Sequence, residues 1–182
     1  MVRRDARGAR TVTAEAERAR FEDAVGPLIP DLLRYFVRRV EPRADADDCV
    51  SETTLALWRH RKRLPVASED QRMWAFGIAR NVLANHTRKR ARRARIDQAL
   101  VREVPEPASD QAFLALEALR TLAPADQELL RLVLWDGFGV AEAGALAGVR
   151  PAAARKRYER ARARLRAAFG ELQPALAGGR DA

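Results

Sequence analysis

The chain has few of the residues from which catalytic and metal-binding centres are built. Its 182 residues include one cysteine, Cys49, and two histidines, His60 and His86. A single cysteine excludes a disulfide within the chain and a cysteine-cluster zinc site, and two histidines argue against a histidine-rich metal site. The sequence also lacks a nucleophile spaced with a base as in a catalytic triad. We therefore expect a protein without a cofactor and without catalysis of its own.

Long apolar runs and strand patterns are missing as well. No stretch is long and apolar enough to cross a bilayer, and no signal peptide is recognisable. The alternation of apolar and polar residues that marks a half-buried strand is absent, whereas the helix formers alanine and leucine are abundant. The sequence therefore predicts an all-α fold, a cytoplasmic location and no membrane insertion.

Acidic residues are too few to balance the basic ones. The chain has 34 Lys and Arg against 25 Asp and Glu, which gives a net charge of +9 at pH 7 and a pI of about 10.9. Such a surplus favours a polyanionic partner, either nucleic acid or an anionic membrane surface. Two runs, residues 88–95 and 150–166, are especially rich in bases.

Residues 140–166 have the pattern of a helix-turn-helix. Gly148 follows a short predicted helix over residues 140–147 and can adopt the positive φ that ends it. Pro151 suits the first turn of a second helix, predicted to reach about Phe169, because its missing N–H would have no helical partner there. A basic second helix of this kind enters the major groove of DNA. A solvated basic face on an ordinary helical hairpin is the alternative.

Proline and glycine divide the rest of the chain into further predicted helices. The first begins at Thr13 and breaks at Gly26–Pro27, and Ser68 to Gln71 form a capping-box pattern before a later one. The helices after the first cover residues 45–64, 71–93, 110–122 and 124–136. Their predicted inward residues include Cys49, Val50, Thr53 and Leu57; Trp74, Ile78 and Val82; and Phe113, Leu116, Leu119 and Leu122.

Composition changes around the proline-rich segment from Val104 to Ser109, which cannot be helical throughout. We therefore predict two small helical domains joined by a flexible linker. The predicted parts are a disordered basic arm at 1–13, a helical domain at 14–95, the linker at 96–110, a helix-turn-helix domain at 111–169 and a frayed tail at 170–182.

The two domains resemble one known family. DADDCVSETTLALWRHRKRL followed by RMWAFGIARNVLANHTRKRARR resembles region 2 of the bacterial sigma-70 family, especially its small extracytoplasmic-function group. LEALRTLAPADQELLRLVLWDGFGVAEAGALAGVRPAAARKRYERARARLRAAF resembles region 4 of the same group. The resemblance covers roughly residues 21–93 and 113–169, and two blocks in the right order are far more specific than either alone.

The resemblance implies a sigma factor that binds core RNA polymerase and directs it to promoter DNA. Region 2 would dock on the polymerase clamp and hold the melted −10 element, and a loop of region 2 would capture an unpaired base. Region 4 would read the −35 duplex. An anti-sigma factor is a further partner expected of the group. The residues implied for polymerase binding are Asp47, Asp48, Glu52, Leu55 and Trp58. Those for the −10 element are Arg80, Asn81, Asn85, Arg88 and Lys89, and those for the −35 element are Arg150, Ala152, Ala153, Arg155, Lys156, Arg157 and Arg160.

Several residues depart from the family or allow two interpretations. Trp74 and Phe76 are candidate platforms for stacked bases, although the apolar neighbours of Trp74 favour core packing. Cys49 replaces a usual aliphatic, and we interpret it as a small buried hydrophobe and not as a redox sensor. Larger apolar residues are common in the family at Ala143, Ala147 and Ala154, and Gly144 replaces a usual alanine, so the helix-turn-helix is expected to pack less tightly. Gly139 replaces the common Ser or Thr, so one N-cap hydroxyl is missing.

Three other functional classes fit parts of the sequence. A stand-alone helix-turn-helix repressor or activator would explain residues 111–169 but would leave residues 45–90 without a role. A non-specific basic protein that binds DNA or RNA would tolerate scrambling of the second helix at constant charge. A hydrolase or transferase fits least, because the sequence shows no constellation for its chemistry.

Overall fold

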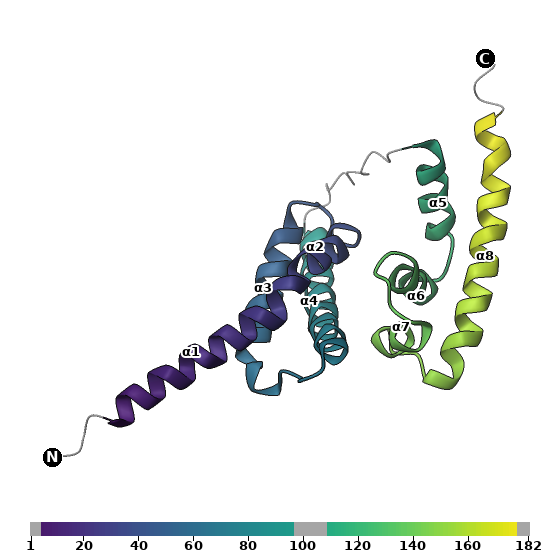
Figure 1. Cartoon of the computed structure of the whole chain (residues 1–182). Coiled ribbons are helices and arrows are strands. Elements are labelled where there is room, and N and C mark those ends of the chain that lie inside the picture. Colours follow the sequence, from purple (N-terminus) through teal and green to yellow (C-terminus); the bar gives the residue numbers. More distant parts are fainter. Residues whose placement is uncertain (1–4, 97–108, 178–182) are drawn as a thin grey trace. The chain divides into compact units, whose positions relative to one another are not determined.

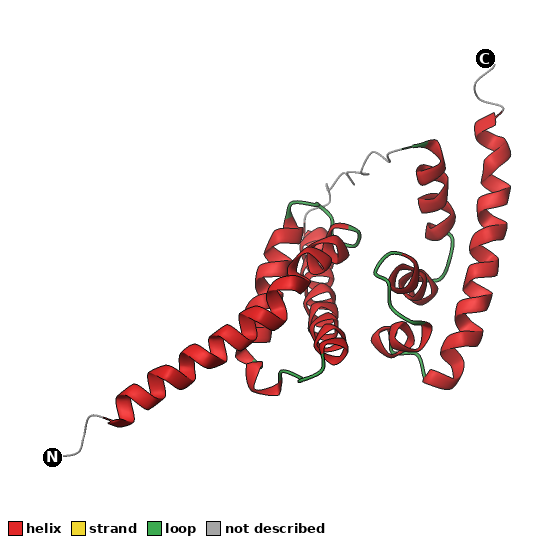
Figure 2. Ribbon diagram, in the orientation of Figure 1, coloured by secondary structure: helices red, strands yellow, loops and turns green. Residues whose placement is uncertain are grey.

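The computed structural model describes residues 5–96 and 109–177, and these ranges are helices joined by short connections (Figures 1 and 2). No strand occurs in the part of the chain so described. The chain divides into two compact units, residues 1–102 and 103–182, and this division falls inside the predicted linker. Each unit has its own core, so the predicted all-α fold with two helical domains is confirmed.

The described part of the N-terminal unit, residues 5–96, is built from four α-helices and two short 3₁₀ turns. Its elements are α1 (Asp5–Val25), η1 (Gly26–Leu28), α2 (Ile29–Val37), α3 (Asp45–Arg59), η2 (Arg61–Arg63) and α4 (Ser68–Ile96). Helices α2 and α4 both pack on α3, and α1 packs on α4. The core contains an aromatic group in which the Tyr35 ring meets Phe36 and Phe76 edge to face, at centroid distances of 5.2 and 5.4 Å.

Proline and glycine set the connections in this unit. The predicted break at Gly26–Pro27 is confirmed, because η1 separates α1 from α2 there. Helix α3 ends at Arg59, short of the predicted residue 64, and η2 follows it. Pro65 ends this stretch, because Leu64 before it has ψ of 118°, outside the helical range. Gln71 does not close a capping box on Ser68, since its Nε2 donates to the carbonyl oxygens of Pro65 and Val66 at 3.1 and 3.3 Å.

Two other predictions for the N-terminal unit need correction. Helix α1 begins at Asp5, so residues 5–13 are helical and not a disordered arm; residues 1–4 lie outside the described ranges. That stretch contains no proline, so no residue in it prevents the helix from beginning before Thr13. In α4 the buried side is Ala75, Phe76, Ala79 and Val82, whereas Trp74 and Ile78 are only half-buried.

The C-terminal unit contains α5 (Asp110–Arg120), α6 (Pro124–Leu134), α7 (Val140–Ala147) and α8 (Pro151–Ala177). Helix α8 packs on the other three and so forms the support of the unit (Figure 1). Ser109 caps α5, where its Oγ accepts the N–H of Ala112 at 3.2 Å. Gly137 and Gly148 end their helices with φ of 72° and 73°, as predicted.

Two predictions for the C-terminal unit are also wrong. Helix α5 buries Leu114, Ala118 and Leu119, while Phe113 and Leu116, predicted to face inward, are 38% and 39% exposed. An alanine- and leucine-rich helix has more than one apolar side, so periodicity alone did not identify the packed one. Helix α8 continues to Ala177, so residues 170–177 are not a frayed tail; residues 178–182 lie outside the described ranges.

Helix α7 approaches α8 very closely at Gly144. A Cβ atom built on Gly144 would lie only 2.5 Å from the Cβ of Ala154, which is far inside van der Waals contact. Hydrogen bonds from the N–H groups of Gly148 and Val149 to the carbonyl oxygens of Ala145 and Gly144, at 3.2 and 2.8 Å, close the turn between the helices. The missing side chain at 144 therefore permits close packing, contrary to the expectation that it loosens the motif.

Gly144→Ala is expected to destabilise the C-terminal unit by about 1–3 kcal/mol, because overpacking outweighs the better helix propensity of alanine. Gly170→Ala is the matched control in α8, since no atom lies within 4 Å of its added Cβ. It should stabilise the protein by about 0.5–1 kcal/mol. Urea unfolding followed by circular dichroism measures both changes, and a stabilising Gly144→Ala would contradict the close contact.

Candidate nucleic-acid and polymerase interfaces

The start of α8 is an exposed surface made of small and basic side chains. Arg150 caps the helix through its carbonyl oxygen, which accepts the N–H groups of Ala153 and Ala154 at 2.9 and 3.1 Å. Ala152, Ala153, Arg155 and Lys156 follow, and all four are exposed. No acidic side chain among the described residues pairs with Arg150, Arg155 or Lys156. This first turn and a half of α8 can therefore offer its charges to a polyanion.

Arg157 and Arg160, which were predicted with that surface, have different surroundings. The Nε of Arg157 donates to Oδ1 of Asp126 at 2.6 Å, and the arginine is half-buried. Arg160 is exposed, and its Nε lies 3.4 Å from the carbonyl oxygen of Lys156. Sequence reasoning missed Asp126, because an acid in the first turn of a helix is ordinarily explained by the helix dipole.

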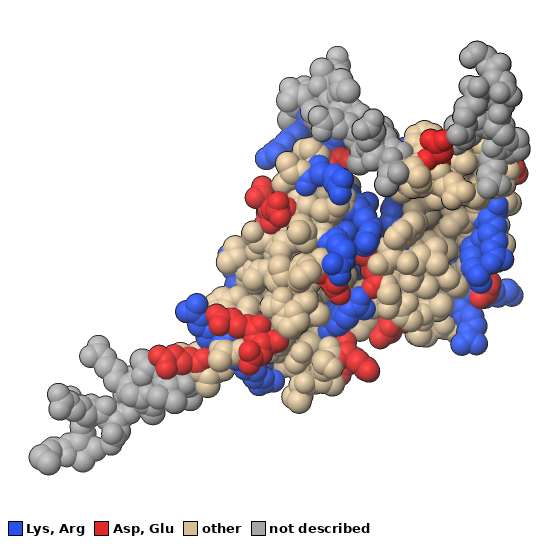
Figure 3. Space-filling model, turned by 45° about the horizontal axis from the view of Figure 1, so that its top comes forward, with Lys and Arg blue, Asp and Glu red and all other residues tan. Residues whose placement is uncertain are grey.

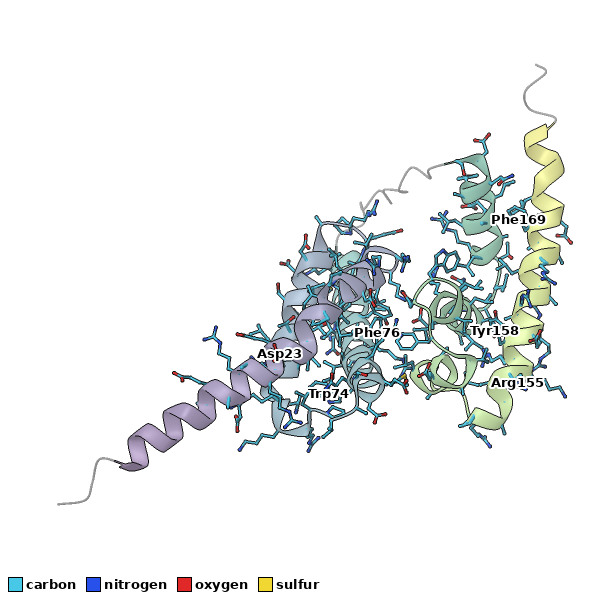
Figure 4. All side chains as sticks on the ribbon, viewed as in Figure 1. Asp23, Trp74, Phe76, Arg155, Tyr158 and Phe169 are labelled. Atoms are coloured by element: carbon cyan, nitrogen blue, oxygen red, sulfur yellow. The ribbon has the colours of Figure 1, made fainter. Side chains whose placement is uncertain are left out.

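Basic side chains extend along α8 from Arg155 to Arg166. Figure 3 shows Lys and Arg gathered over the part of the C-terminal unit that α8 forms. On the opposite side of the helix, Ala154, Tyr158 and Ala161 are buried against the rest of the unit, and Figure 4 shows Tyr158 on that inner side. Because residues three or four apart share a helix face, the apolar and basic sides of α8 separate cleanly.

The predicted −10 residues lie on α4. Asn81, Asn85 and Arg88 are spaced by four and three residues, so they share one exposed side of the helix, and Oδ1 of Asn85 accepts from Nη2 of Arg88 at 2.7 Å. Arg80 and Lys89 are exposed on either side of them. Lys89 lies 3.6 Å from Glu52 of α3, in an ion pair between two exposed side chains.

The two candidate stacking platforms on α4 differ in burial. Phe76 is 1% exposed and belongs to the aromatic core, so it is not available to a base. Trp74 is half-buried and lies seven residues before Asn81, which places it on the same side of the helix. Of the two, only Trp74 has surface beside the polar residues.

The loop between η2 and α4 presents an exposed apolar side chain. Val66 is 89% exposed, and Gln71 fixes the backbone around it through the two hydrogen bonds described above. Three basic residues of η2 precede this loop: Arg61, Lys62 and Arg63. The loop therefore presents one exposed apolar side chain close in sequence to three basic ones.

The predicted polymerase residues lie on α3. Asp48, Glu52 and Leu55 are spaced by four and three residues and share an exposed side, and Asp47 is exposed next to them. Leu55 is 56% exposed, which the helix-dipole explanation of the neighbouring acids does not account for. Trp58 is half-buried: its ring meets Phe21 at 5.0 Å, and the Arg61 guanidinium lies 4.4 Å from the ring centroid. Part of Trp58 therefore holds α1 and η2 against α3.

Cys49 is a core residue of α3. It is 2% exposed, and burial raises the pKa of its thiol to about 11, with smaller contributions from the negative charges of Glu52, Asp45 and Asp48. The interpretation of Cys49 as a small hydrophobe is consistent with this burial.

Within the described ranges, no group of three or more His, Cys, Asp or Glu side chains could hold a metal ion. No helix in these ranges is long and apolar enough to span a membrane.

Two helical units, one carrying an exposed basic helix in a helix-turn-helix, define a DNA-binding protein. Comparison with known proteins identifies its family. The family model for Sigma-70 region 2 matches residues 25–93 of this chain, and the family model for Sigma-70, region 4 matches residues 112–165. The chain belongs to the extracytoplasmic-function (ECF) group of RNA polymerase sigma factors. As such it associates with core RNA polymerase and directs promoter-specific initiation of transcription.

Individual relatives support this assignment. The RNA polymerase sigma factor CarQ of Myxococcus xanthus is 31% identical over 159 residues, which cover 84% of this chain and 91% of CarQ. The ECF RNA polymerase sigma factor SigF of Caulobacter vibrioides is 32% identical over 157 residues, covering 81% and 84% of the two chains. Among solved structures, the sigma factor RpoE in complex with the anti-sigma factor NepR from Bartonella quintana shares the fold, with 24% identity, a TM-score of 0.68 and coverage of 82% and 96%.

The Cys49 thiol is expected to react very slowly with a thiol reagent in the native protein. With its pKa raised to about 11, only about one thiol in a thousand is ionised at about pH 8, and burial blocks access as well. Labelling followed by mass spectrometry measures the rate, with the protein in denaturant as the control. Fast labelling of the native protein would contradict the burial of Cys49.

Proposed function

We propose that the three exposed surfaces divide the work of promoter recognition. The start of α8, with Arg150, Ala152, Ala153, Arg155 and Lys156, contacts the −35 duplex in the major groove. The polar side of α4 and the loop at Val66 hold the melted −10 strand. The acidic side of α3 with Leu55 docks on core RNA polymerase. The protein performs no catalysis of its own and acts in the cytoplasm, where promoter DNA is found.

The observation that carries the −35 assignment is the combination of small and basic side chains at the exposed start of α8. Ala152 and Ala153 allow the helix to approach the base edges, and Arg155 and Lys156 have no acidic partner among the described residues. An arginine can bind guanine in a bidentate manner, and phosphate contacts by the remaining bases would make the binding salt-sensitive. Arg160 is proposed to contact a phosphate, and Arg157 to support the surface from behind.

The −10 and polymerase assignments rest on exposure and helix spacing. Asn81, Asn85 and Arg88 offer amide and guanidinium groups on one side of α4, and Trp74 extends that side toward the loop. On α3, a half-exposed leucine among acids would combine apolar burial with charge complementarity to a basic partner. An anti-sigma factor is proposed as a further partner, as in the RpoE–NepR complex.

Run-off transcription from a library of genomic fragments, with core RNA polymerase in the presence and absence of this protein, tests the whole proposal. New start sites that share sequence motifs near −35 and −10 are the expected result. A protein that is folded by circular dichroism, yet gives no new transcripts and does not bind the core enzyme, would contradict it. That result would favour a stand-alone DNA-binding regulator.

Separate variants should uncouple DNA recognition from polymerase binding. Arg155→Ala should lower the affinity of the assembled holoenzyme for a promoter with an intact −35 element by about tenfold to a hundredfold, the loss expected for one bidentate base contact. It should leave polymerase binding unchanged. Asp48→Ala with Leu55→Ala should weaken polymerase binding instead, as measured by fluorescence anisotropy of the labelled sigma factor.

The controls follow from the structure. Arg166→Ala removes the same charge from an exposed position 11 residues further along α8, and it should reduce affinity for intact and scrambled −35 elements equally. Leu55 is a better target than Trp58, because removal of Trp58 would also break its contact with Phe21. If Arg155→Ala and Arg166→Ala had identical effects, Arg155 would be a phosphate contact and not a base reader.

A further inference from the structure

Asp126 is a buried carboxylate that joins two helices of the C-terminal unit. It lies in the first turn of α6 and is 5% exposed. Two arginines of α8 donate to it: Nε of Arg157 to Oδ1 at 2.6 Å, and Nη1 of Arg164 to Oδ2 at 3.2 Å. Both carboxylate oxygens are therefore occupied by α8. A charge placed at a helix start only to complement the dipole would not need to be buried or paired in this way.

The arginines around Asp126 lie on one flank of α8. Arg157, Arg160 and Arg164 are separated by three and four residues, so they follow one another along the same side of the helix. Together with Asp126 they line a small hollow of about 190 Å³. Among the described residues that line this hollow, Asp126 is the only acid beside three arginines. Its two hydrogen bonds hold Arg157 and Arg164, whereas Nε of Arg160 lies 3.4 Å from the carbonyl oxygen of Lys156.

The opposite flank of α8 is free. Arg155, Arg162 and Arg166 follow one another at spacings of seven and four residues, all are exposed, and none pairs with an acid among the described residues. The helix thus has one flank held by Asp126 and one flank of unpaired bases. Arg155, the strongest candidate base reader, belongs to the free flank.

On the inner side of α8, Ala154, Tyr158 and Ala161 are buried against the rest of the unit, and opposite Ala154 stands Gly144, which has no side chain. Apolar contacts of this kind are not directional, whereas an arginine–carboxylate hydrogen bond is directional. Functional groups must be held within about 10–20° of their working geometry, so a directional contact on one flank has consequences for the other.

We propose that Asp126 is a positioning residue for −35 recognition. By holding Arg157 and Arg164 it sets the rotation of α8 at which Arg155 and Lys156 meet the base edges. Arg157 accordingly acts through Asp126 and does not read a base. The inference rests on the proposed role of α8 in −35 binding, and it adds a residue on α6 that touches no DNA.

The experiment uses the full chain assembled with core RNA polymerase and a promoter identified by run-off transcription. The quantity measured is the discrimination ratio, which is the affinity for that promoter divided by the affinity for the same promoter with a scrambled −35 element. Asp126→Asn should lower this ratio by about 5- to 20-fold, because the base contacts of α8 are misaligned. Affinity for the scrambled promoter should stay equal or rise slightly, because one negative charge has been removed.

Two further variants separate positioning from charge. Glu171→Gln removes the same charge from an exposed position on α8, so it should raise both affinities slightly and leave the ratio unchanged. Arg157→Gln should lower the ratio about as much as Asp126→Asn, and the double variant should be no worse than either single one, because both break one contact. If Asp126→Asn fails to fold, Arg164→Gln, whose side chain is 64% exposed, removes one of the two hydrogen bonds and should give a smaller loss of the ratio.

Three results would contradict the positioning role of Asp126 or the −35 assignment on which it rests. An unchanged ratio in a folded Asp126→Asn protein, or an equal loss of affinity for both promoters, would reduce Asp126 to a stabilising residue and overturn the proposal. Additive losses from Asp126→Asn and Arg157→Gln would also overturn it, because Arg157 would then act directly on DNA. A wild-type protein that does not distinguish the two promoters would instead refute the −35 assignment itself.

Discussion

Close contact between α7 and α8 at Gly144 and Ala154 is the constraint on which the helix-turn-helix depends. The two helices can meet there only because position 144 has no side chain, and Gly148 turns the chain back with φ of 73°. The N–H of Val149 then returns to the carbonyl oxygen of Gly144 at 2.8 Å. Because α8 packs on the unit through Ala154, Tyr158 and Ala161, its remaining sides can carry basic side chains.

Charge in this protein is arranged for interaction more than for stability. The ion pair between Lys89 of α4 and Glu52 of α3 is exposed, and such a pair contributes little to folding. Apolar contacts around Tyr35, Phe36 and Leu57 hold the N-terminal unit together instead. The acids of α3 and the amides and bases of α4 can therefore serve partners without weakening the fold. Asp126 and Asp136 of the C-terminal unit differ from these residues, since both are acids and both are buried.

Helix boundaries were predictable where glycine or proline imposes a backbone conformation. The C-terminal end of α7, the start of α8 and the break between α1 and α2 follow from Gly148, Pro151 and Gly26–Pro27, because glycine permits a positive φ, whereas proline restricts φ and removes a donor. Packed faces were less predictable. Phe113 and Trp74 fitted an apolar period, yet other residues of the same helices are buried, because packing partners distant in sequence select the side that is covered.

The sequence by itself determined the helical class, the two-domain order, the helix-turn-helix and the exposed bases at its start, since each depends on local propensity, spacing or the resemblance of continuous blocks. Tertiary structure alone decided which charges are free. Arg155 and Arg157 look equivalent in the sequence, but Arg157 meets Asp126, which lies 31 residues away. Likewise, the Trp58 ring contacts Phe21 and is therefore only partly available, and the buried Phe76 ring contacts Tyr35. Contacts between residues so far apart arise only when the helices pack, and no local pattern encodes them.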